Sequence, residues 1–354
     1  MSDKRNDRPG GYVRPLNLKQ GRVEMGHGAG GRASAQLIEE LFVAAFDNDW
    51  LRQGNDQAAF GVPAGARMVM STDAHVVSPL FFPGGDIGSL SVHGTINDVA
   101  MSGAQPLYLA ASFIIEEGLE LAELKRIVHS MAAAARAAGV PVITGDTKVV
   151  EQGKGDGVFI TTTGVGVVAP DIHVDGAAAR PGDAIIVSGS IGEHGMAIMS
   201  KRESLEFDSE IRSDSAALHG LVAAMLAAVP GVRVLRDPTR GGLATTLNEI
   251  ASQSGVGMTL DEAAIPILPE VEAACELLGL DPLYVANEGK LVAICAADDA
   301  ARLVGVMRAH PLGTRAQRIG IVTEDPNCFV QMKTKFGGTR MVDWLSGEQL
   351  PRIC

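Results

Sequence analysis

Aromatic side chains are scarce in this sequence. Only 15 of the 354 residues are aromatic: two Trp, three Tyr and ten Phe. Aliphatic residues, methionine and alanine must therefore fill the interior, and a hydrophobic fraction of 46% is enough for a compact α/β protein of two domains. No apolar run reaches the roughly 18 residues that a membrane span requires. The polar stretch Met1 to Gly11 lacks the apolar segment of a signal peptide, so we expect neither insertion nor export.

Basic residues are also fewer than acidic ones. The sequence holds 30 basic and 42 acidic residues, for a formal net charge of −12, and shows no basic stripe. Such a surface repels nucleic acid, so we expect no nucleic-acid partner. Six basic residues among the first 22 indicate a solvated flexible arm rather than a nucleic-acid arm. An acidic protein can still bind a nucleotide when Mg²⁺ screens the phosphates.

Cysteine is rare, and the few residues present are widely spaced. This spacing excludes a zinc knuckle and a redox pair. Cys295 continues the apolar run from Leu291 to Ile294, which predicts a buried core position. Together these features favour a cytoplasmic protein. The four cysteines are Cys275, Cys295, Cys328 and Cys354.

Helical and strand patterns alternate in both halves, which predicts an α/β (α+β) fold of two domains. In the first half we expect helices at 37–45, 88–101 and 121–135, and strands at 68–73, 107–115, 142–144 and 158–168. In the second half we expect strands at 184–188, 232–235, 256–260 and 291–295, with helices beginning near 218 and 243 and another ending near 310. Turn formers at 170–182 separate the halves. The expected units are a flexible extension (1–20), an N-terminal domain (21–170), a C-terminal domain (171–345) and a mobile tail (346–354).

A glycine cluster, Gly26 to Gly31, precedes the first predicted helix. Glycines let a backbone approach a ligand closely, and a helix N-terminus offers N–H donors to phosphate. The spacing matches neither the Walker loop nor the dinucleotide fingerprint. A structural turn and a phosphate-binding loop therefore both remain open.

Aspartates lie at the edges of several predicted elements. Asp56 follows Asn55 in a polar turn, Asp73 closes the first predicted strand, and Asp146 directly follows the strand at 142–144. A single aspartate in such a place is more often a helix cap. Asp98, however, lies within a predicted helix, where capping does not apply. Carboxylate oxygens suit Mg²⁺, which takes one or two of them and keeps waters or phosphates as its other ligands.

Three charged residues elsewhere are ambiguous on local grounds. On an extended segment Lys148 and Asp146 point the same way, although an isolated lysine is usually a surface residue. The segment Asp237 to Gly242 joins a strand to a helix and is either a plain turn or, through Arg240, a phosphate clamp. Glu288 precedes the strand at 291–295, where a lone glutamate is usually solvated.

The chain ends in Cys354. A terminal thiol with no residue beyond it to bury it is a liability unless it is used. The segment 347–354 reaches roughly 25 Å when extended, enough to carry the thiol between two sites. Prenylation is a poor alternative because its signal places the cysteine four residues from the end. A terminal cysteine that arose by chance stays open.

Several of these segments together resemble the HypE family of hydrogenase maturation factors, the carbamoyl dehydratases. That family belongs to the ATP-binding superfamily of aminoimidazole ribonucleotide synthetase, selenophosphate synthetase and thiamine-monophosphate kinase. The resemblance covers about residue 25 to the end and is specific because the motifs occur in order. They are HGAGG (27–31), STDAHVVSPLFFPGGDIG (71–88), GTINDVAMSGAQP (94–106), TGDTKVV (144–150), RDPTRGG (236–242), ANEGKLV (286–292) and PRIC (351–354).

The resemblance implies a synthetase-like ATP-binding fold, with an N-terminal domain that binds ATP and metal and forms a homodimer through its sheet. ATP would lie in a cleft between the domains. Cys354 would carry the substrate, Glu288 would act as base or relay, and Lys148 would steer the amide oxygen or γ-phosphate. The implied Mg²⁺ residues are Asp56, Asp73, Asp98 and Asp146. The implied nucleotide-binding residues are His27, Gly28, Gly30, Gly31, Asn97, Arg240, Gly241 and Gly242.

The resemblance also implies a reaction and its partners. The carbamoyltransferase HypF would load a carbamoyl group onto Cys354. ATP-dependent dehydration would give a thiocyanate, and its cyano group would pass to iron in the HypC–HypD complex for [NiFe]-hydrogenase assembly. One alternative is a kinase or ligase of the superfamily that acts on a free small molecule, which would not need the thiol tail. Another is a carrier without catalysis, which would not need the aspartates and glycine loop.

Overall fold

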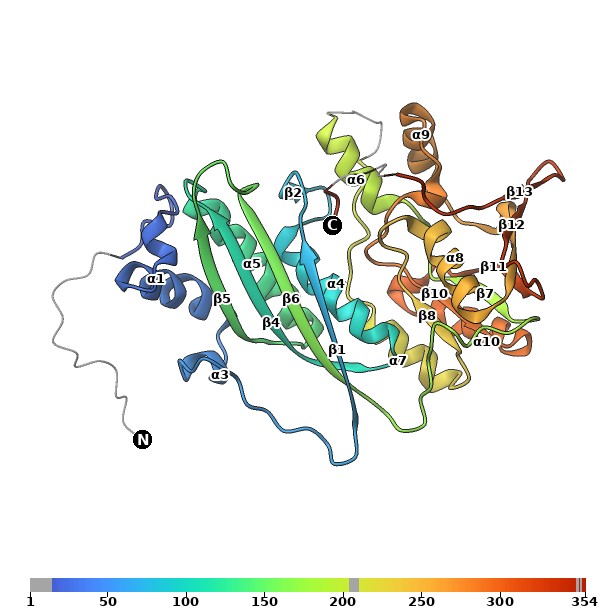
Figure 1. Ribbon diagram of the computed structural model, residues 1–354, viewed down its shortest axis with the longest axis horizontal. Coiled ribbons are helices and arrows are strands. Elements are labelled where there is room, and N and C mark those ends of the chain that lie inside the picture. Colours follow the sequence, from blue (N-terminus) through green and yellow to red (C-terminus); the bar gives the residue numbers. More distant parts are fainter. Residues whose placement is uncertain (1–14, 204–209, 348–349, 351) are drawn as a thin grey trace.

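The chain folds into two lobes that lie side by side (Figure 1). The computed structural model describes residues 15–203, 210–347, 350 and 352–354. Within these ranges no helix combines the length and apolar character needed to cross a bilayer. The two-domain α/β fold expected from the sequence is confirmed.

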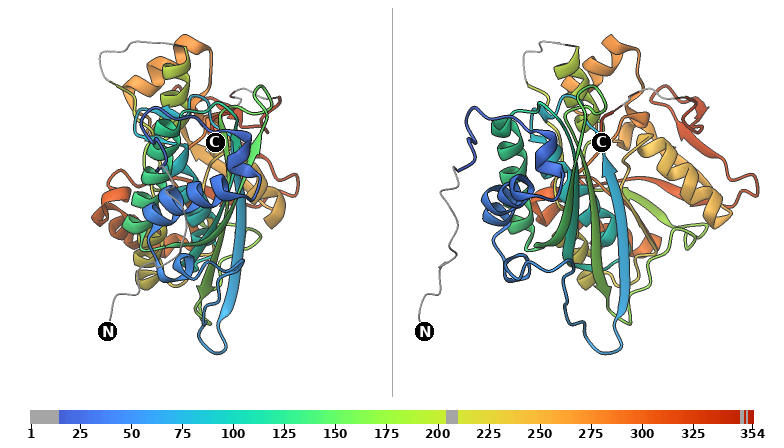
Figure 2. Two further views of the ribbon diagram at one scale, coloured as in Figure 1. Left: turned by 90° about the vertical axis from the view of Figure 1, so that its left-hand side faces the viewer. Right: turned by 60° about the vertical axis from the view of Figure 1, so that its left-hand side comes forward.

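The N-terminal lobe is built on a four-stranded sheet in the order β1-β6-β4-β5. Strands β4 and β5 are parallel, and the other pairs are antiparallel. Helices α4 and α5 cover one face, as the edge-on view in Figure 2 shows. Four apolar residues of α5 are fully buried there, and Gly139 ends this helix with a left-handed φ of 68°. The bounds are β1 Arg67–His75, α4 Ile87–Met101, β4 Gln105–Glu116, α5 Leu121–Ala138, β5 Val142–Val150 and β6 Val158–Val168.

Among the described residues, no helix covers the opposite face of this sheet, here called the outer face. It carries the alternate residues of each strand, among them Met68 and Met70 of β1 and their cross-strand partners Val167 and Val165 of β6. Met70 is 72% exposed. Short elements flank the sheet: η1 Met25–Gly28, α1 Arg32–Leu37, η2 Ile38–Val43, α2 Ala44–Phe46, α3 Asp49–Arg52, β2 Phe81–Phe82 and β3 Gly85–Asp86.

The C-terminal lobe holds a seven-stranded sheet in the order β13-β12-β9-β11-β7-β10-β8. Helix α8 packs on one face, and α7 and α10 pack on the other. The strands are β7 Ala184–Val187, β8 Val234–Arg236, β9 Gly257–Asp261, β10 Val292–Cys295, β11 Gln317–Thr323, β12 Val330–Lys333 and β13 Thr339–Met341. The helices are α6 Glu193–Arg202, α7 His219–Ala228, α8 Gly242–Ser254, η3 Glu262–Ala264, α9 Pro269–Leu278, η4 Pro282–Tyr284, η5 Ala297–Asp299, α10 Ala300–Ala309 and η6 Pro311–Gly313.

Helix α4 joins the lobes. Its last turn, Val99 to Met101, shares a core cluster with Leu221 and Met225 of α7. The end of the chain makes a second connection between the lobes. Ile353 is only 5% exposed, packs in the core of the N-terminal lobe and forms a β-bridge with Val77. Burial of apolar side chains from both lobes in shared clusters fixes their relative position.

Segments with a strong apolar periodicity form the helices and strands that were predicted for them. Strands rich in polar residues differ from their predicted bounds. The predicted strand 158–168 is β6, and the helix at 88–101 is α4. The prediction that Asp73 and Asp146 follow the ends of strands is wrong, because β1 continues to His75 and β5 to Val150. Each of these strands contains a run of polar residues, Ser71 to Asp73 in β1 and Asp146 to Lys148 in β5, and therefore lacks the alternation typical of a half-buried strand. Elements α6, α9, β11, β12 and β13 were not predicted.

The N-terminal extension falls largely outside the described residues, which begin at residue 15. Its last part is packed rather than flexible. The N–H of Leu16 donates to the Glu40 carboxylate at 2.8 Å, and Leu16 and Leu18 pack against the core of the N-terminal lobe. The folded chain therefore starts before the boundary expected at residue 20.

Candidate functional site

Acidic side chains converge where the two lobes meet. We call Asp73, Asp98, Asp237 and Glu288 the inter-lobe acidic cluster. Gly94 of α4 makes room for it: a methyl group added there would lie 2.9 Å from His75 Nε2, 3.5 Å from Asp73 Oδ2 and 3.8 Å from Glu288 Oε2. On the same helix, Asp98 Oδ2 accepts a hydrogen bond from Ser71 Oγ at 2.8 Å. The four carboxylates thus come together from strand β1, helix α4 and the two loops that carry Asp237 and Glu288.

The cluster carries more negative charge than its surroundings balance. Burial raises the pKa of Asp237 to about 7, and the charge of Asp98 adds to this shift. Burial likewise raises the pKa of Asp98, and it raises that of Glu288 well above its ordinary value, with Asp237 as the next cause. Repelling buried carboxylates of this kind are what a bound divalent cation relieves.

The donor set fits Mg²⁺. Among the residues that the structure describes, no group of three or more His, Cys, Asp or Glu side chains could by itself hold a metal ion. Mg²⁺ does not need such a group, because it usually binds one or two carboxylates and keeps waters or phosphates. Asp73 and Asp98 are the carboxylates best placed to hold it.

The loop that carries Glu288 is held rigidly by two buried side chains. Asn97 Nδ2 donates to the carbonyls of Ala216 and Glu288 at 3.0 and 3.1 Å, and Asn97 Oδ1 accepts from Leu218 N–H at 2.8 Å. The Asp214 carboxylate accepts from the backbone N–H groups of Glu288 and Gly289, each at 3.1 Å. Burial alone would raise the pKa of Asp214, but the Lys290 ammonium lowers it. Asn97, expected to bind nucleotide, here uses its amide to hold the Glu288 loop.

We predict that Asn97→Ala lowers the free energy of unfolding by about 3 kcal/mol, because buried backbone groups lose their partners. Urea unfolding measures this change. Asn55→Ala is the matched control, since the Asn55 amide is exposed and donates to Gln53 Oε1 at 3.2 Å, and we expect a change of less than about 0.5 kcal/mol. Equal effects of the two substitutions would contradict a structural role for Asn97.

The chain terminus lies against the same cluster. The backbone N–H of Val76 donates to the Cys354 carbonyl at 3.2 Å, and that of Ser78 donates to the Arg352 carbonyl at 3.1 Å. Burial raises the pKa of the Cys354 thiol, and the nearby Glu288 carboxylate raises it further. The charges of Arg240 and Asp73 also act on this thiol. The structure therefore brings Cys354, Glu288, Asp73, Asp98 and Arg240 together.

A second group of predicted residues lies along β5. Lys148 Nζ and Asp146 Oδ2 are 2.7 Å apart, and the hydrogen bond from Lys148 lowers the pKa of Asp146. The glycine loop packs beside them: a Cβ on Gly28 would lie 2.6 Å from the Val149 nitrogen. Only glycine permits this approach. The loop is closed at its start by the buried ring of His27, whose Nδ1 accepts from Glu24 N–H.

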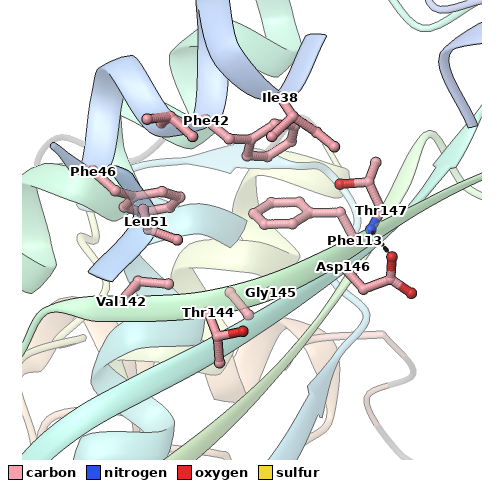
Figure 3. A pocket seen from close by; sticks show the side chains of 12 residues that line it. Ile38, Phe42, Phe46, Leu51, Phe113, Val142, Thr144, Gly145, Asp146 and Thr147 are labelled. Carbon is pink, nitrogen blue, oxygen red and sulfur yellow. Dashed lines mark hydrogen bonds between the residues drawn. The ribbon is translucent and has the colours of Figure 1, made fainter. Parts of the chain in front are cut away.

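An apolar pocket of about 110 Å³ adjoins this second group. The rings of Phe42 and Phe113, 4.8 Å apart between centroids, point into it from the N-terminal helices and from β4 (Figure 3). Phe46 lines it as well, while Gly145 and Asp146 of β5 form its rim. A flat apolar ring with polar groups at one end would match this shape and lining.

The two groups are separate within one chain. Pairing across the sheet aligns Asp146 with Ser112, Thr161 and Ala74, whereas Asp73 points to the other face of β1. The groups therefore lie on opposite edges, three strand spacings or about 14 Å apart. Asp56 is exposed in the loop that joins α3 to β1, and this loop passes the end of the sheet away from the C-terminus (Figure 1). Within one chain the four aspartates do not come together, and their assignment to an Mg²⁺ site stays a prediction.

The remaining predicted residues have local roles. Gly241 and Gly242 have left-handed φ values of 75° and 62°, and a Cβ on Gly242 would lie 2.5 Å from the Leu283 carbonyl oxygen. They shape the turn into α8. Gly30 also has a positive φ of 77°, and added side chains at Gly30 and Gly31 would meet open space. These two glycines leave the loop backbone accessible.

Sequence reasoning missed several residues of the inter-lobe site. Asp237 directly follows β8, so the same signal that selected Asp146 could have selected it. His75, with its Nε2 3.3 Å from Asp73 Oδ2, belongs to the alternation of β1 but gave no local signal. Asp214 and His194 lie in segments without a recognisable pattern.

Comparisons with known proteins agree with this architecture. Residues 54–168 match the family described as AIR synthase related protein, N-terminal domain, and residues 180–333 match its C-terminal domain. The chain is 82% identical to carbamoyl dehydratase HypE of Cupriavidus necator, over 97% of this chain and 98% of that protein.

Solved structures of hydrogenase maturation protein HypE superpose on the fold. A crystal structure of HypE in complex with ATP has a TM-score of 0.90 and 50% identity, and the match covers 93% of this chain and 99% of that one. HypE from a HypE–HypF complex has a TM-score of 0.77 and 47% identity, with coverage of 87% and 99%.

Proposed function

Because this chain belongs to the carbamoyl dehydratase HypE family of hydrogenase maturation proteins, we propose that it uses ATP to dehydrate a carbamoyl group on Cys354. The product is a thiocyanate on the same sulfur. The observation that carries the proposal is the position of Cys354, held at the edge of a buried acidic cluster beside Glu288.

The proposed chemistry replaces a poor leaving group with a good one. The amide oxygen of the S-carbamoyl group attacks the γ-phosphorus of ATP, the bond between this phosphorus and the β–γ bridging oxygen breaks, and ADP leaves. The nitrogen loses one proton as the C=N bond forms. The nitrogen then loses its second proton, the C–O bond breaks, and phosphate leaves a C≡N group on sulfur. Mg²⁺ would neutralise charge on the phosphoryl oxygens.

Glu288 is the proposed acceptor of the nitrogen protons. Its carboxylate is buried, and the hydrogen bonds from Asn97 and to Asp214 hold its backbone. A desolvated carboxylate is a stronger base than one in water, which suits proton abstraction near neutral pH. Lys148 is the proposed residue that steers the amide oxygen or the γ-phosphate.

We place the nucleotide along β5. The adenine ring fits the apolar pocket between Phe42, Phe46 and Phe113, which ends at Asp146. The phosphates would then follow β5 past Lys148 and the loop of Gly28, Gly30 and Gly31, where backbone donors and an ammonium are available.

A homodimer through the outer face would complete the site. If two sheets pack face to face about a two-fold axis along their strands, β5 of one chain lies opposite β1 of the other. Asp146 and Lys148 of one chain then approach Asp73 and Cys354 of its partner. The apolar row of this face, in which Met70 is 72% exposed and Val165 is half-buried, supports this interface, because such a face is costly to leave in water.

Met70→Glu should therefore dissociate the dimer. A carboxylate in an apolar interface costs about 3 kcal/mol, so we expect the dimer dissociation constant to rise about 100-fold. Sedimentation velocity over a concentration series measures it. Leu277→Glu on α9, another exposed apolar position, is the control and should leave assembly unchanged. Equal dissociation constants for Met70→Glu and the unsubstituted chain would exclude this interface.

The partners follow from the same chemistry. The raised pKa of Cys354 beside Glu288 keeps the thiol neutral and weakly nucleophilic in its present position. Carbamoyl transfer by HypF therefore takes place with the tail away from the cluster. Delivery of the cyano group to iron in the HypC–HypD complex requires the same exit.

Mass analysis of the C-terminal peptide tests the function. The protein is incubated with carbamoyl phosphate, HypF and MgATP. We expect the peptide to gain one carbamoyl group and then lose one water in an ATP-dependent step. A carbamoylated peptide that never loses water would indicate a carrier. A peptide that stays unmodified while a free small molecule is phosphorylated would indicate a kinase.

A further inference from the structure

His194 lies in the first turn of α6 and is fully buried. Its ring meets the ring of Phe82 edge on, with centroids 5.6 Å apart and an interplanar angle of 89°. Nothing in the chemistry described above uses this histidine. Its contacts nevertheless connect the C-terminal lobe to the last residues of the chain.

Two hydrogen bonds fix the tautomer of the ring. His194 Nε2 lies 2.6 Å from the Ile353 carbonyl oxygen, and Nδ1 lies 2.8 Å from Ser213 Oγ. A carbonyl oxygen can only accept, so Nε2 carries the proton and donates it. Nδ1 then accepts from the Ser213 hydroxyl. Burial lowers the pKa of His194, in agreement with a neutral ring.

Hydrogen bonds also hold the backbone of Ser213 and of the residue that follows it. Its backbone N–H donates to the Pro83 carbonyl at 2.8 Å. The next residue, Asp214, holds the backbone of Glu288 and Gly289. The His194 ring and the proposed base are therefore anchored to the same two-residue segment.

The isolated β-bridge between Val77 and Ile353 explains the place of the histidine. In the tail segment (residues 352–354) the carbonyls of Arg352 and Cys354 accept from the Ser78 and Val76 backbones. The carbonyl of Ile353, between them, has His194 as its partner. Arg202, on the same helix as His194, donates to the Arg352 carbonyl at 2.9 Å and so holds the start of this segment.

We propose that His194, oriented by Ser213, is a positioning residue that holds the tail segment where Cys354 faces Glu288; the catalytic part of this inference rests on the function proposed above. A displacement of the tail segment by one residue would move the thiol by about 3.3 Å, out of its place beside Glu288.

Two substitutions separate the hydrogen bond from the bulk of the ring. His194→Gln places an amide nitrogen where Nε2 was, whereas His194→Asn places its polar atoms near Nδ1 and cannot reach Ile353. Hydrogen exchange at the Val76 and Ser78 amides reports on tail binding without any turnover. Single-turnover dehydration of carbamoyl-loaded protein, together with the KM for ATP, reports on the chemistry.

For His194→Asn we expect exchange at both amides to rise about tenfold and the dehydration rate to fall about tenfold, the factor expected for one lost hydrogen bond. The KM for ATP should stay unchanged. His194→Gln should stay within about threefold of the unsubstituted chain in both measurements. Ser213→Ala, which leaves α6 intact, should shift both in the same direction as His194→Asn.

Arg352→Ala is the control on the tail itself. It removes an exposed ion pair with Asp156, and such pairs contribute little, so exchange at Val76 and Ser78 should change less than about twofold. Unchanged exchange in both His194→Asn and Ser213→Ala would overturn the positioning role. The exchange result stands even if the C-terminal peptide never loses water, so failure of the proposed function is seen separately.

Discussion

Cys354→Ala is expected to abolish thiocyanate formation completely while MgATP binding stays within about twofold of the unsubstituted chain. In the proposed reaction the side chain supplies the sulfur on which the substrate is built, so no other group can replace it. Its backbone contacts with Val76 and the packing of Ile353 do not involve the sulfur. The fold and the nucleotide site should therefore survive the change.

Mass analysis of the C-terminal peptide and calorimetric titration with MgATP measure the two parts of this prediction. Cys328→Ala is the matched control, because Cys328 is also a free, half-buried cysteine but lies in the loop before β12. It should keep full product formation. A Cys354→Ala protein that loses ATP binding would show that this cysteine is structural, and one that still yields cyanide product would exclude it as the carrier.

Glu288→Gln is expected to slow dehydration by about 10²–10⁴-fold, the usual contribution of a positioned base. Glutamine keeps the shape of the side chain but cannot accept the nitrogen proton. Carbamoylation of Cys354 by HypF should continue at its normal rate, because it takes place away from the cluster. The measurement is thiocyanate formation in a single turnover, started by adding MgATP to protein already loaded with the carbamoyl group.

Glu249→Gln provides the comparison for Glu288. The Glu249 carboxylate of α8 pairs with Arg236 at the end of β8 and is not a member of the inter-lobe cluster, so its loss should change the rate less than about threefold. If Glu288→Gln forms thiocyanate as fast as the unsubstituted chain, the base lies elsewhere. A loss of ATP binding in this variant would instead assign Glu288 to the nucleotide site.

Much of the first lobe could be predicted because its helices bury one continuous face. Helix α5 buries Leu124, Ile127, Val128 and Met131 at helical spacing and ends at Gly139, and this signal survives in any window of sequence. Strands β1 and β5 were predicted too short. Each of them contains a run of polar residues, Ser71 to Asp73 in β1 and Asp146 to Lys148 in β5, and local sequence does not distinguish such a run from a loop.

For the candidate functional site, too, some features follow from local sequence and others only from the tertiary structure. By itself the sequence determined which residues are candidates for chemistry: the ordered motifs, the terminal cysteine and the resemblance that implies their roles are all properties of the linear chain. Only the tertiary structure decided which of them meet. It placed Asp73 and Asp146 on opposite edges of one sheet, turned the Asn97 amide to the Glu288 loop, and paired His194 with Ile353, 159 residues away. Contacts of this kind depend on strand order and helix packing, which the periodicity of a segment does not encode.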